Sequence, residues 1–107
     1  MSDVIEIGET ANGGQIELRL RQTLRITLSE AQTAGFRWNL RALTEGVCAL
    51  IKEDREPPPG PAGGAGNHAW ELRAEAVGSV EILIEYRRPW ERTTAPARSF
   101  SISVRVA

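Results

Sequence analysis

The sequence predicts an all-β fold, an antiparallel sandwich of about seven or eight short strands in one domain spanning residues 1–107. Two observations lead to this prediction. Apolar and polar side chains alternate with a period of two along nearly the whole chain, as in strands with one buried and one solvated face. Turn residues separate the alternating runs, and no helical repeat of useful length interrupts them. A chain of this size can form one hydrophobic core without disulfides or metals.

The expected strands follow one another with apolar positions two residues apart. Residues 3–7 and 47–53 are the weaker candidates, and turns are expected at residues 11–14 and 77–79. The apolar positions of the stronger candidates are Ile16, Leu18 and Leu20; Leu24, Ile26 and Leu28; Phe36, Trp38 and Leu40; Trp70, Leu72, Ala74 and Ala76; Val80, Ile82, Ile84 and Tyr86; and Phe100, Ile102, Val104 and Val106. A slip of one residue would turn every apolar side chain outward, so the alternation specifies the register well.

Composition argues against several function classes. Thirteen basic and fourteen acidic side chains give a net charge of -1, without the basic stripe that nucleic-acid binding needs. No apolar run approaches the roughly 20 residues of a membrane span. The first residues lack the features of a signal peptide, so the sequence as given predicts a cytoplasmic protein, whereas a trimmed leader would place it in the periplasm or outside the cell. Twelve arginines against one lysine suggest a GC-rich bacterial genome.

The single cysteine and the single histidine, Cys48 and His68, are the candidates for a nucleophile and its base. Cys48 lies in the apolar run 47–51, where a thiol ordinarily fills a core or sheet position. One cysteine excludes a disulfide within the chain and a four-cysteine metal site. The sequence also has no convincing acid–base pair or phosphate-binding loop. We therefore expect no enzyme activity and no cofactor.

Three connections differ from ordinary linkers. They comprise residues 29–35, 57–67 and 87–96, and in the second of them eight of the first ten residues are proline or glycine. Each has a simple structural explanation: Gly35 could supply a turn, the proline and glycine tract could be a flexible tip, and Pro89 could merely end a strand. Considered one at a time, they do not establish a function.

Taken together, the three connections resemble the motifs of the chagasin-like family of cysteine-protease inhibitors, in the family's order and spacing. The family's first motif reads Asn-Pro-Thr-Thr-Gly-Tyr-x-Trp and aligns with residues 31–38. The positions that keep the motif are Thr33, Gly35, the aromatic Phe36, and Trp38. Asn, Pro and the second Thr are replaced by Ala31, Gln32 and Ala34.

The other two motifs match more fully. The second, Gly-x-Gly-Gly with an aromatic residue four positions later, aligns with residues 63–66 and Trp70, and only its third position departs. The third, Arg-Pro-Trp after a strand that ends in tyrosine, is matched without change by residues 88–90 after Tyr86. The resemblance extends over about residues 4–106, nearly the whole chain.

The resemblance implies an immunoglobulin-like sandwich with the three loops gathered at one end. In the family these loops enter the active-site cleft of papain-like cysteine proteases, so the implied function is reversible, non-covalent occlusion by a monomer, with no metal, nucleic acid or membrane involved. The residues implied at the protease interface are Thr33, Ala34, Gly35, Gly63, Gly64, Gly66, Arg88, Pro89 and Trp90.

The tryptophans are expected to divide into two roles. Trp38 and Trp70 fall on the apolar faces of their strands and should anchor the roots of the first and second loops in the core. Trp90 follows a proline at a loop apex, where an exposed rigid aromatic is a plausible binding hot spot. Arg88 could hydrogen-bond a partner or stack on a neighbouring ring, or it could be a solvated charge or an internal brace of the loop.

The altered first motif has a physical consequence and leaves a second function open. Asn and Pro order a turn, and a Thr hydroxyl can contribute a hydrogen bond worth about 1 kcal/mol, so their loss should weaken docking. The alternative function is a non-inhibitory immunoglobulin-like module that uses the same loops to bind another protein or a carbohydrate.

Overall fold

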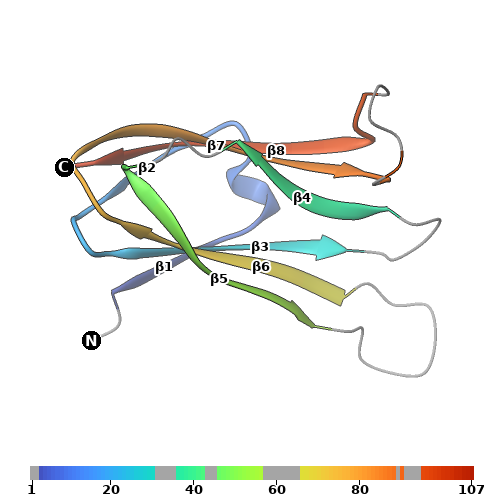
Figure 1. Ribbon diagram of the computed structural model, residues 1–107, viewed down its shortest axis with the longest axis horizontal. Helices are drawn as coiled ribbons and strands as arrows, with labels where there is room; N and C mark the ends of the chain where they lie inside the picture. Colours follow the sequence, from blue (N-terminus) through green and yellow to red (C-terminus); the bar gives the residue numbers. More distant parts are fainter. Residues whose placement is uncertain (1–2, 31–35, 43–45, 57–65, 89, 91–94) are drawn as a thin grey trace.

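The computed structural model describes residues 3–30, 36–42, 46–56, 66–88, 90 and 95–107. Two four-stranded sheets lie face to face (Figure 1). The first has the order β1-β3-β6-β5 and comprises β1 (Val4–Ile7), β3 (Thr23–Glu30), β6 (Gly66–Ala74) and β5 (Cys48–Glu56). The second has the order β2-β8-β7-β4 and comprises β2 (Gln15–Leu18), β8 (Arg98–Val106), β7 (Gly78–Arg87) and β4 (Arg37–Ala42).

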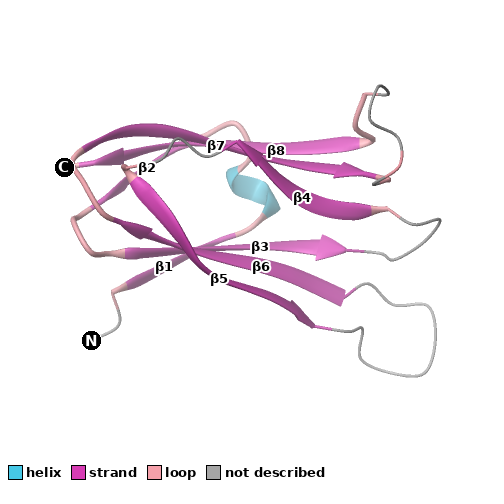
Figure 2. Ribbon diagram, viewed as in Figure 1, coloured by secondary structure: helices cyan, strands magenta, loops and turns pink. Residues whose placement is uncertain are grey.

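The predicted sandwich of seven or eight strands is confirmed. Both weaker candidates are strands: the N-terminal one is β1, and the one predicted over 47–53 is β5, which continues to Glu56. In the described part of the chain, the one helical segment is a 3-10 turn, η1 (Glu9–Ala11), between β1 and β2 (Figure 2). The turn that follows η1 lies where residues 11–14 predict it, with Gly13 at a φ of 80° that favours glycine.

Four of the six strand pairs in the described residues are antiparallel as predicted, but two edge pairs are parallel. β1 runs parallel to β3, and β2 runs parallel to β8. The chain crosses from one sheet to the other between β1 and β2 and crosses back between β2 and β3. Parallel neighbours require such crossover connections, which period-two alternation does not reveal.

Two strands are shorter than their apolar pattern predicts. β2 ends at Leu18, and Leu20 is half exposed because the chain turns toward β3 through Arg21, whose φ is 71°. β6 ends at Ala74, so Ala76 lies in the bend before β7. In both places the alternation of apolar residues in the sequence continues beyond the last residue that pairs with a neighbouring strand.

The core fills the space between the sheets with the predicted inward-facing side chains. Trp38 and Trp70 are 1% and 0% exposed, which confirms both as core anchors. The other buried members of the core are Leu18, Leu24, Ile26, Leu28, Cys48, Leu72, Ala74, Val80, Ile82, Ile84, Phe100, Ile102, Val104 and Val106. Such a core gives the strand ends a rigid base.

Candidate functional site

Six strand ends meet at one end of the sandwich, which we call the loop end (Figure 1). The register of the sheets establishes this arrangement. The paired residues nearest that end are Glu30 with Gly66, Glu56 with Asn67, Arg37 with Arg87, and Tyr86 with Arg98. The end of β3, the start of β4, the end of β5, the start of β6, the end of β7 and the start of β8 therefore lie together. All three of the unusual connections leave and re-enter the fold here.

The strands extend further into these connections than the sequence predicts. Ser29 and Glu30 belong to β3, Gly66 and Asn67 belong to β6, and Arg87 belongs to β7. The predicted bounds 29–35, 57–67 and 87–96 are therefore too wide at these ends. The reason is that Ser29 and Glu30 pair with Asn67 and Gly66, which continues the ladder beyond the last apolar position of each strand.

The structure describes three of the predicted interface residues. Gly66 is buried as the first residue of β6, Arg88 is half-buried just beyond β7, and Trp90 lies in a turn. The others lie outside the described residues: Thr33, Ala34, Gly35, Gly63, Gly64 and Pro89. A protease contact stays a prediction for all of them.

Trp38 joins the two sheets at the loop end. Its indole Nε1 donates to the carbonyl oxygen of Ser29 at 2.9 Å, and its backbone N–H donates to Oε2 of Glu30 at 2.8 Å. Trp38 lies in β4, whereas Ser29 and Glu30 end β3 in the other sheet. These two hydrogen bonds join the strands that flank segment 31–35.

A column of rings and guanidinium groups, which we call the aromatic column, runs along the same end. The Arg88 guanidinium lies 4.6 Å from the Phe36 ring centroid, and Phe36 stacks on Tyr86 with centroids 5.3 Å apart. Tyr86 contacts Trp38 at 5.1 Å, and Arg98 lies over Trp38 at 5.3 Å. The possibility that Arg88 stacks on a neighbouring ring is therefore confirmed. The column connects the end of β7 to the starts of β4 and β8.

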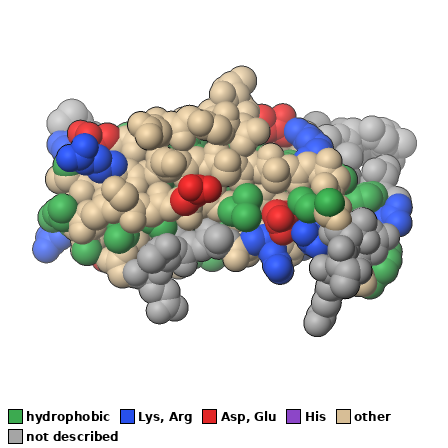
Figure 3. All heavy atoms as spheres, turned by 90° about the horizontal axis from the view of Figure 1, so that it is seen from above, with side chains coloured by type: hydrophobic (Ala, Val, Ile, Leu, Met, Phe, Trp, Pro, Cys, Tyr) green, Lys and Arg blue, Asp and Glu red, His purple; other side chains and the backbone are tan. Residues whose placement is uncertain are grey.

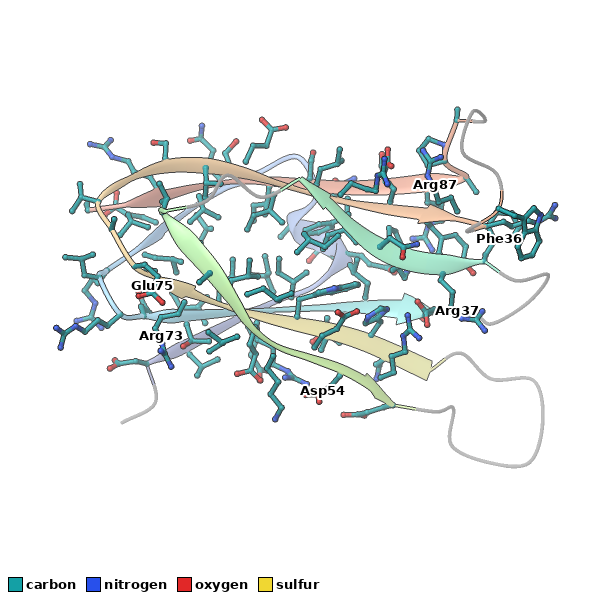
Figure 4. All side chains as sticks on the ribbon, in the orientation of Figure 1. Phe36, Arg37, Asp54, Arg73, Glu75 and Arg87 are labelled. Atoms are coloured by element: carbon teal, nitrogen blue, oxygen red, sulfur yellow. The ribbon has the colours of Figure 1, made fainter. Side chains whose placement is uncertain are left out.

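Figure 4 shows Phe36, Arg37 and Arg87 at the loop end, with Arg73 and Glu75 at the opposite end. Beyond the aromatic column, the Trp90 side chain is 67% exposed. An exposed, rigid aromatic side chain is the kind of residue that forms a binding hot spot. Trp90 therefore has the character that the sequence predicts for a hot spot.

The sequence analysis did not predict a buried polar cluster that lies at the loop end. His68 is fully buried, with Nδ1 2.9 Å from Oε2 of Glu30 and Nε2 2.6 Å from Oε2 of Glu53. Arg55 Nε lies 3.9 Å from the other Glu30 oxygen. One signal was available: Glu30 continues the inward-facing positions of β3, and His68 lies two residues before Trp70 on the inward face of β6.

The structure separates the two residues that were considered as a nucleophile and base. Cys48 pairs with Ala74, six residues along β6 from His68, which is roughly 20 Å in a strand. Burial, and to a lesser degree the negative charge of Glu75, raises the pKa of the Cys48 thiol. A raised pKa lowers the thiolate fraction, so Cys48 is a core residue of low reactivity.

Another feature of the described surface is a hollow on the outer face of the second sheet. A hollow of about 670 Å³ lies on the outer face of β2, β8 and β7 and is lined by exposed polar residues such as Gln15, Glu81 and Arg105. Charged side chains of both signs are scattered over the face seen in Figure 3. Within the described ranges, no group of three or more metal-ligating side chains could hold an ion, and no helix is long and apolar enough to cross a membrane.

The fold is an immunoglobulin-like sandwich whose unusual connections and exposed tryptophan lie at one end. Such an arrangement defines a domain that binds a partner through its loops. The family model of the chagasin family peptidase inhibitors I42 matches residues 17–104, so the chain belongs to that family. This confirms the family resemblance found in the sequence. The expectation that the chain is not an enzyme agrees with a family of inhibitors.

One relative matches nearly the whole chain in sequence, and solved structures match it in fold. Amoebiasin-2 of Entamoeba histolytica is 26% identical over 99 residues, which are 90% of this chain and 80% of that protein. The crystal structure of EhICP2, a cysteine protease inhibitor from Entamoeba histolytica, has a TM-score of 0.88 at 22% identity and covers 97% of this chain and 96% of its own. The structure of PbICP-C in complex with falcipain-2 has a TM-score of 0.73 at 15% identity and covers 97% and 98%.

At these identities the two structural likenesses establish the fold of the chain. The curated relative and EhICP2 come from Entamoeba histolytica, so the bacterial origin suggested by the composition stays a prediction. The cytoplasmic location and the monomeric state stay predictions as well.

Proposed function

We propose that this chain is a reversible, non-covalent inhibitor of papain-like cysteine proteases, and that it fills the active-site cleft with its loop end. The observation that carries the proposal is the exposed Trp90, two residues after Arg88 of the aromatic column, in a chain of the chagasin family of peptidase inhibitors. A structural neighbour solved in complex with falcipain-2, and another described as a cysteine protease inhibitor, support this class of partner.

The proposed mechanism is occlusion by shape. The two sheets fix the strand ends, and the Trp38 hydrogen bonds and the aromatic column hold the roots of the first and third connections together. Because these groups are ordered before binding, less conformational entropy is lost when the loop end enters a cleft. No bond is made or broken, so the inhibitor leaves the protease unchanged.

The alternative of a non-inhibitory binding module has less support. The family model matches residues 17–104 as a peptidase inhibitor, which favours the inhibitor over a carbohydrate-binding module.

Titration of papain with the purified chain tests the proposal. Hydrolysis of a small peptide substrate should fall as the chain is added, inhibition should be competitive with that substrate, and activity should return on dilution. Full papain activity at high micromolar concentrations of the chain would contradict the proposal.

A further inference from the structure

His68 is held between two carboxylates at the loop end, and we call Glu30, Glu53 and His68 the histidine clamp. The ring nitrogens lie 2.9 Å from Glu30 and 2.6 Å from Glu53. The imidazole is fully buried and stacks on Trp70 with ring centroids 3.9 Å apart. Glu30 is buried, whereas the Glu53 side chain is 45% exposed and gives water access to one side of the clamp.

Counting donors and acceptors defines the proton content of the histidine clamp. An ionised carboxylate only accepts hydrogen bonds, and a neutral imidazole donates from one nitrogen alone. Both His68 contacts can be hydrogen bonds to carboxylates only when the ring carries a proton on each nitrogen. The Oε2 atom of Glu30 already accepts the backbone N–H of Trp38 as well, which fits an ionised carboxylate.

The surrounding charges favour the same proton content. The charged groups facing His68 among the described residues are Glu30 from β3 and Glu53 and Arg55 from β5, while β4 contributes the backbone N–H of Trp38. With a doubly protonated ring, the positive charges of His68 and Arg55 balance the negative charges of Glu30 and Glu53. With a neutral ring, a net negative charge would remain at a largely buried position, which is costly.

The histidine clamp lies at the roots of two loops. Glu30 is the last residue of β3, and its carboxylate accepts a hydrogen bond from the backbone N–H of Trp38 in β4. This bond links the two strands that flank segment 31–35. Glu53 in β5 and His68 in β6 lie on the two strands that flank segment 57–65. One hydrogen-bonded group therefore connects the four strand ends from which the first and second predicted loops emerge.

We propose that Glu30, Glu53 and His68, with a proton on each ring nitrogen, position the roots of the first and second loops for protease binding. The part that concerns protease binding rests on the proposed function. The proton content of the ring does not, and it can be measured on the chain alone.

Nitrogen-detected NMR tests the proton content directly, because His68 is the only histidine and its ring signals need no assignment. At neutral pH we expect both Nδ1 and Nε2 to show attached protons. A neutral ring at neutral pH, with one nitrogen lacking a proton, would overturn the proposal.

Glu53→Ala tests the functional consequence. This variant removes the acceptor of the Nε2 proton, so the inhibition constant for papain should rise roughly tenfold. Glu53→Gln keeps an oxygen that can accept the same proton and should inhibit nearly as strongly as the wild type. Glu81→Ala, which removes an exposed carboxylate from β7, is the matched control and should also behave as the wild type.

Inhibition by Glu53→Ala as strong as that by the wild type would overturn the proposal. Thermal unfolding of the same variants provides a readout without any protease. There Glu53→Ala should have a lower Tm than the wild type, and Glu81→Ala should not. If no protease is inhibited, the proposed function fails, and the NMR measurement still decides whether the histidine clamp holds both ring protons.

Discussion

Replacing Trp90 with alanine should weaken inhibition of a papain-like protease by roughly 30-fold or more, the equivalent of about 2 kcal/mol for a central aromatic hot spot. The indole is 67% exposed, so truncating it removes little that stabilises the free chain. The free energy of unfolding should therefore stay within about 0.5 kcal/mol of the wild type. Inhibition constants and urea unfolding curves of the two proteins measure both effects.

Leu20→Ala is the matched control for Trp90→Ala. Leu20 is also an exposed apolar residue, but it lies in the turn after β2, at the end of the sandwich opposite the loop end. Its truncation should leave inhibition unchanged. Inhibition by Trp90→Ala as strong as that by the wild type would contradict the role assigned to the exposed indole.

Replacing Trp38 with alanine should act on stability first and lower the free energy of unfolding by about 3–5 kcal/mol. The side chain is 1% exposed, and its removal leaves a cavity between the sheets. The change also deprives the Ser29 carbonyl of its indole donor and removes the ring on which Tyr86 and Arg98 pack. Urea unfolding monitored by circular dichroism measures the loss.

Trp38→Phe separates packing from hydrogen bonding. Phenylalanine keeps an apolar ring in the core but cannot donate to Ser29, so we expect a smaller loss, of about 1–3 kcal/mol. A Trp38→Ala variant that unfolds at the same urea concentration as the wild type would show that Trp38 does not anchor the first loop.

Most of the sandwich could be predicted from the sequence because side chains in a strand alternate between two faces. Trp38 and Trp70 fall on apolar faces in the sequence and are buried in the structure. The prediction failed where the pattern continued past the pairing partner, as at Leu20. Alternation records which face a residue occupies and does not record which strands are neighbours, so the parallel edges formed by β1 and β2 were not predictable.

The loop end shows the same division between what could and could not be predicted. The motif match indicated Trp90 and Arg88. Trp90 is exposed and Arg88 lies over the Phe36 ring, while a protease contact of either residue stays a prediction. The contact of His68 with Glu30 joins residues 38 positions apart, and the sequence places each on an inward face without showing that they meet. A charged residue on an apolar face was the available signal, because such a group is rarely buried unless it is paired.

The buried contacts bear on the altered first motif. Ala31, Gln32 and Ala34 remove residues that would order a turn, which should weaken docking. Hydrogen bonds from Trp38 to Ser29 and Glu30 fix the two strand ends that this segment connects. Fixing both ends lowers the entropy that remains to be lost on binding, so this contact partly offsets the altered motif.

Protection of the catalytic cysteine of papain from alkylation tests occlusion of the cleft most directly. With the wild-type chain in excess, the rate at which iodoacetamide modifies that cysteine should fall in proportion to the occupied fraction, and both proteins should be recovered with unchanged mass after dissociation. Trp90→Ala should protect only at higher concentrations. An alkylation rate that the chain leaves unchanged at saturating concentrations would contradict the account, because the loop end would then not cover the active site.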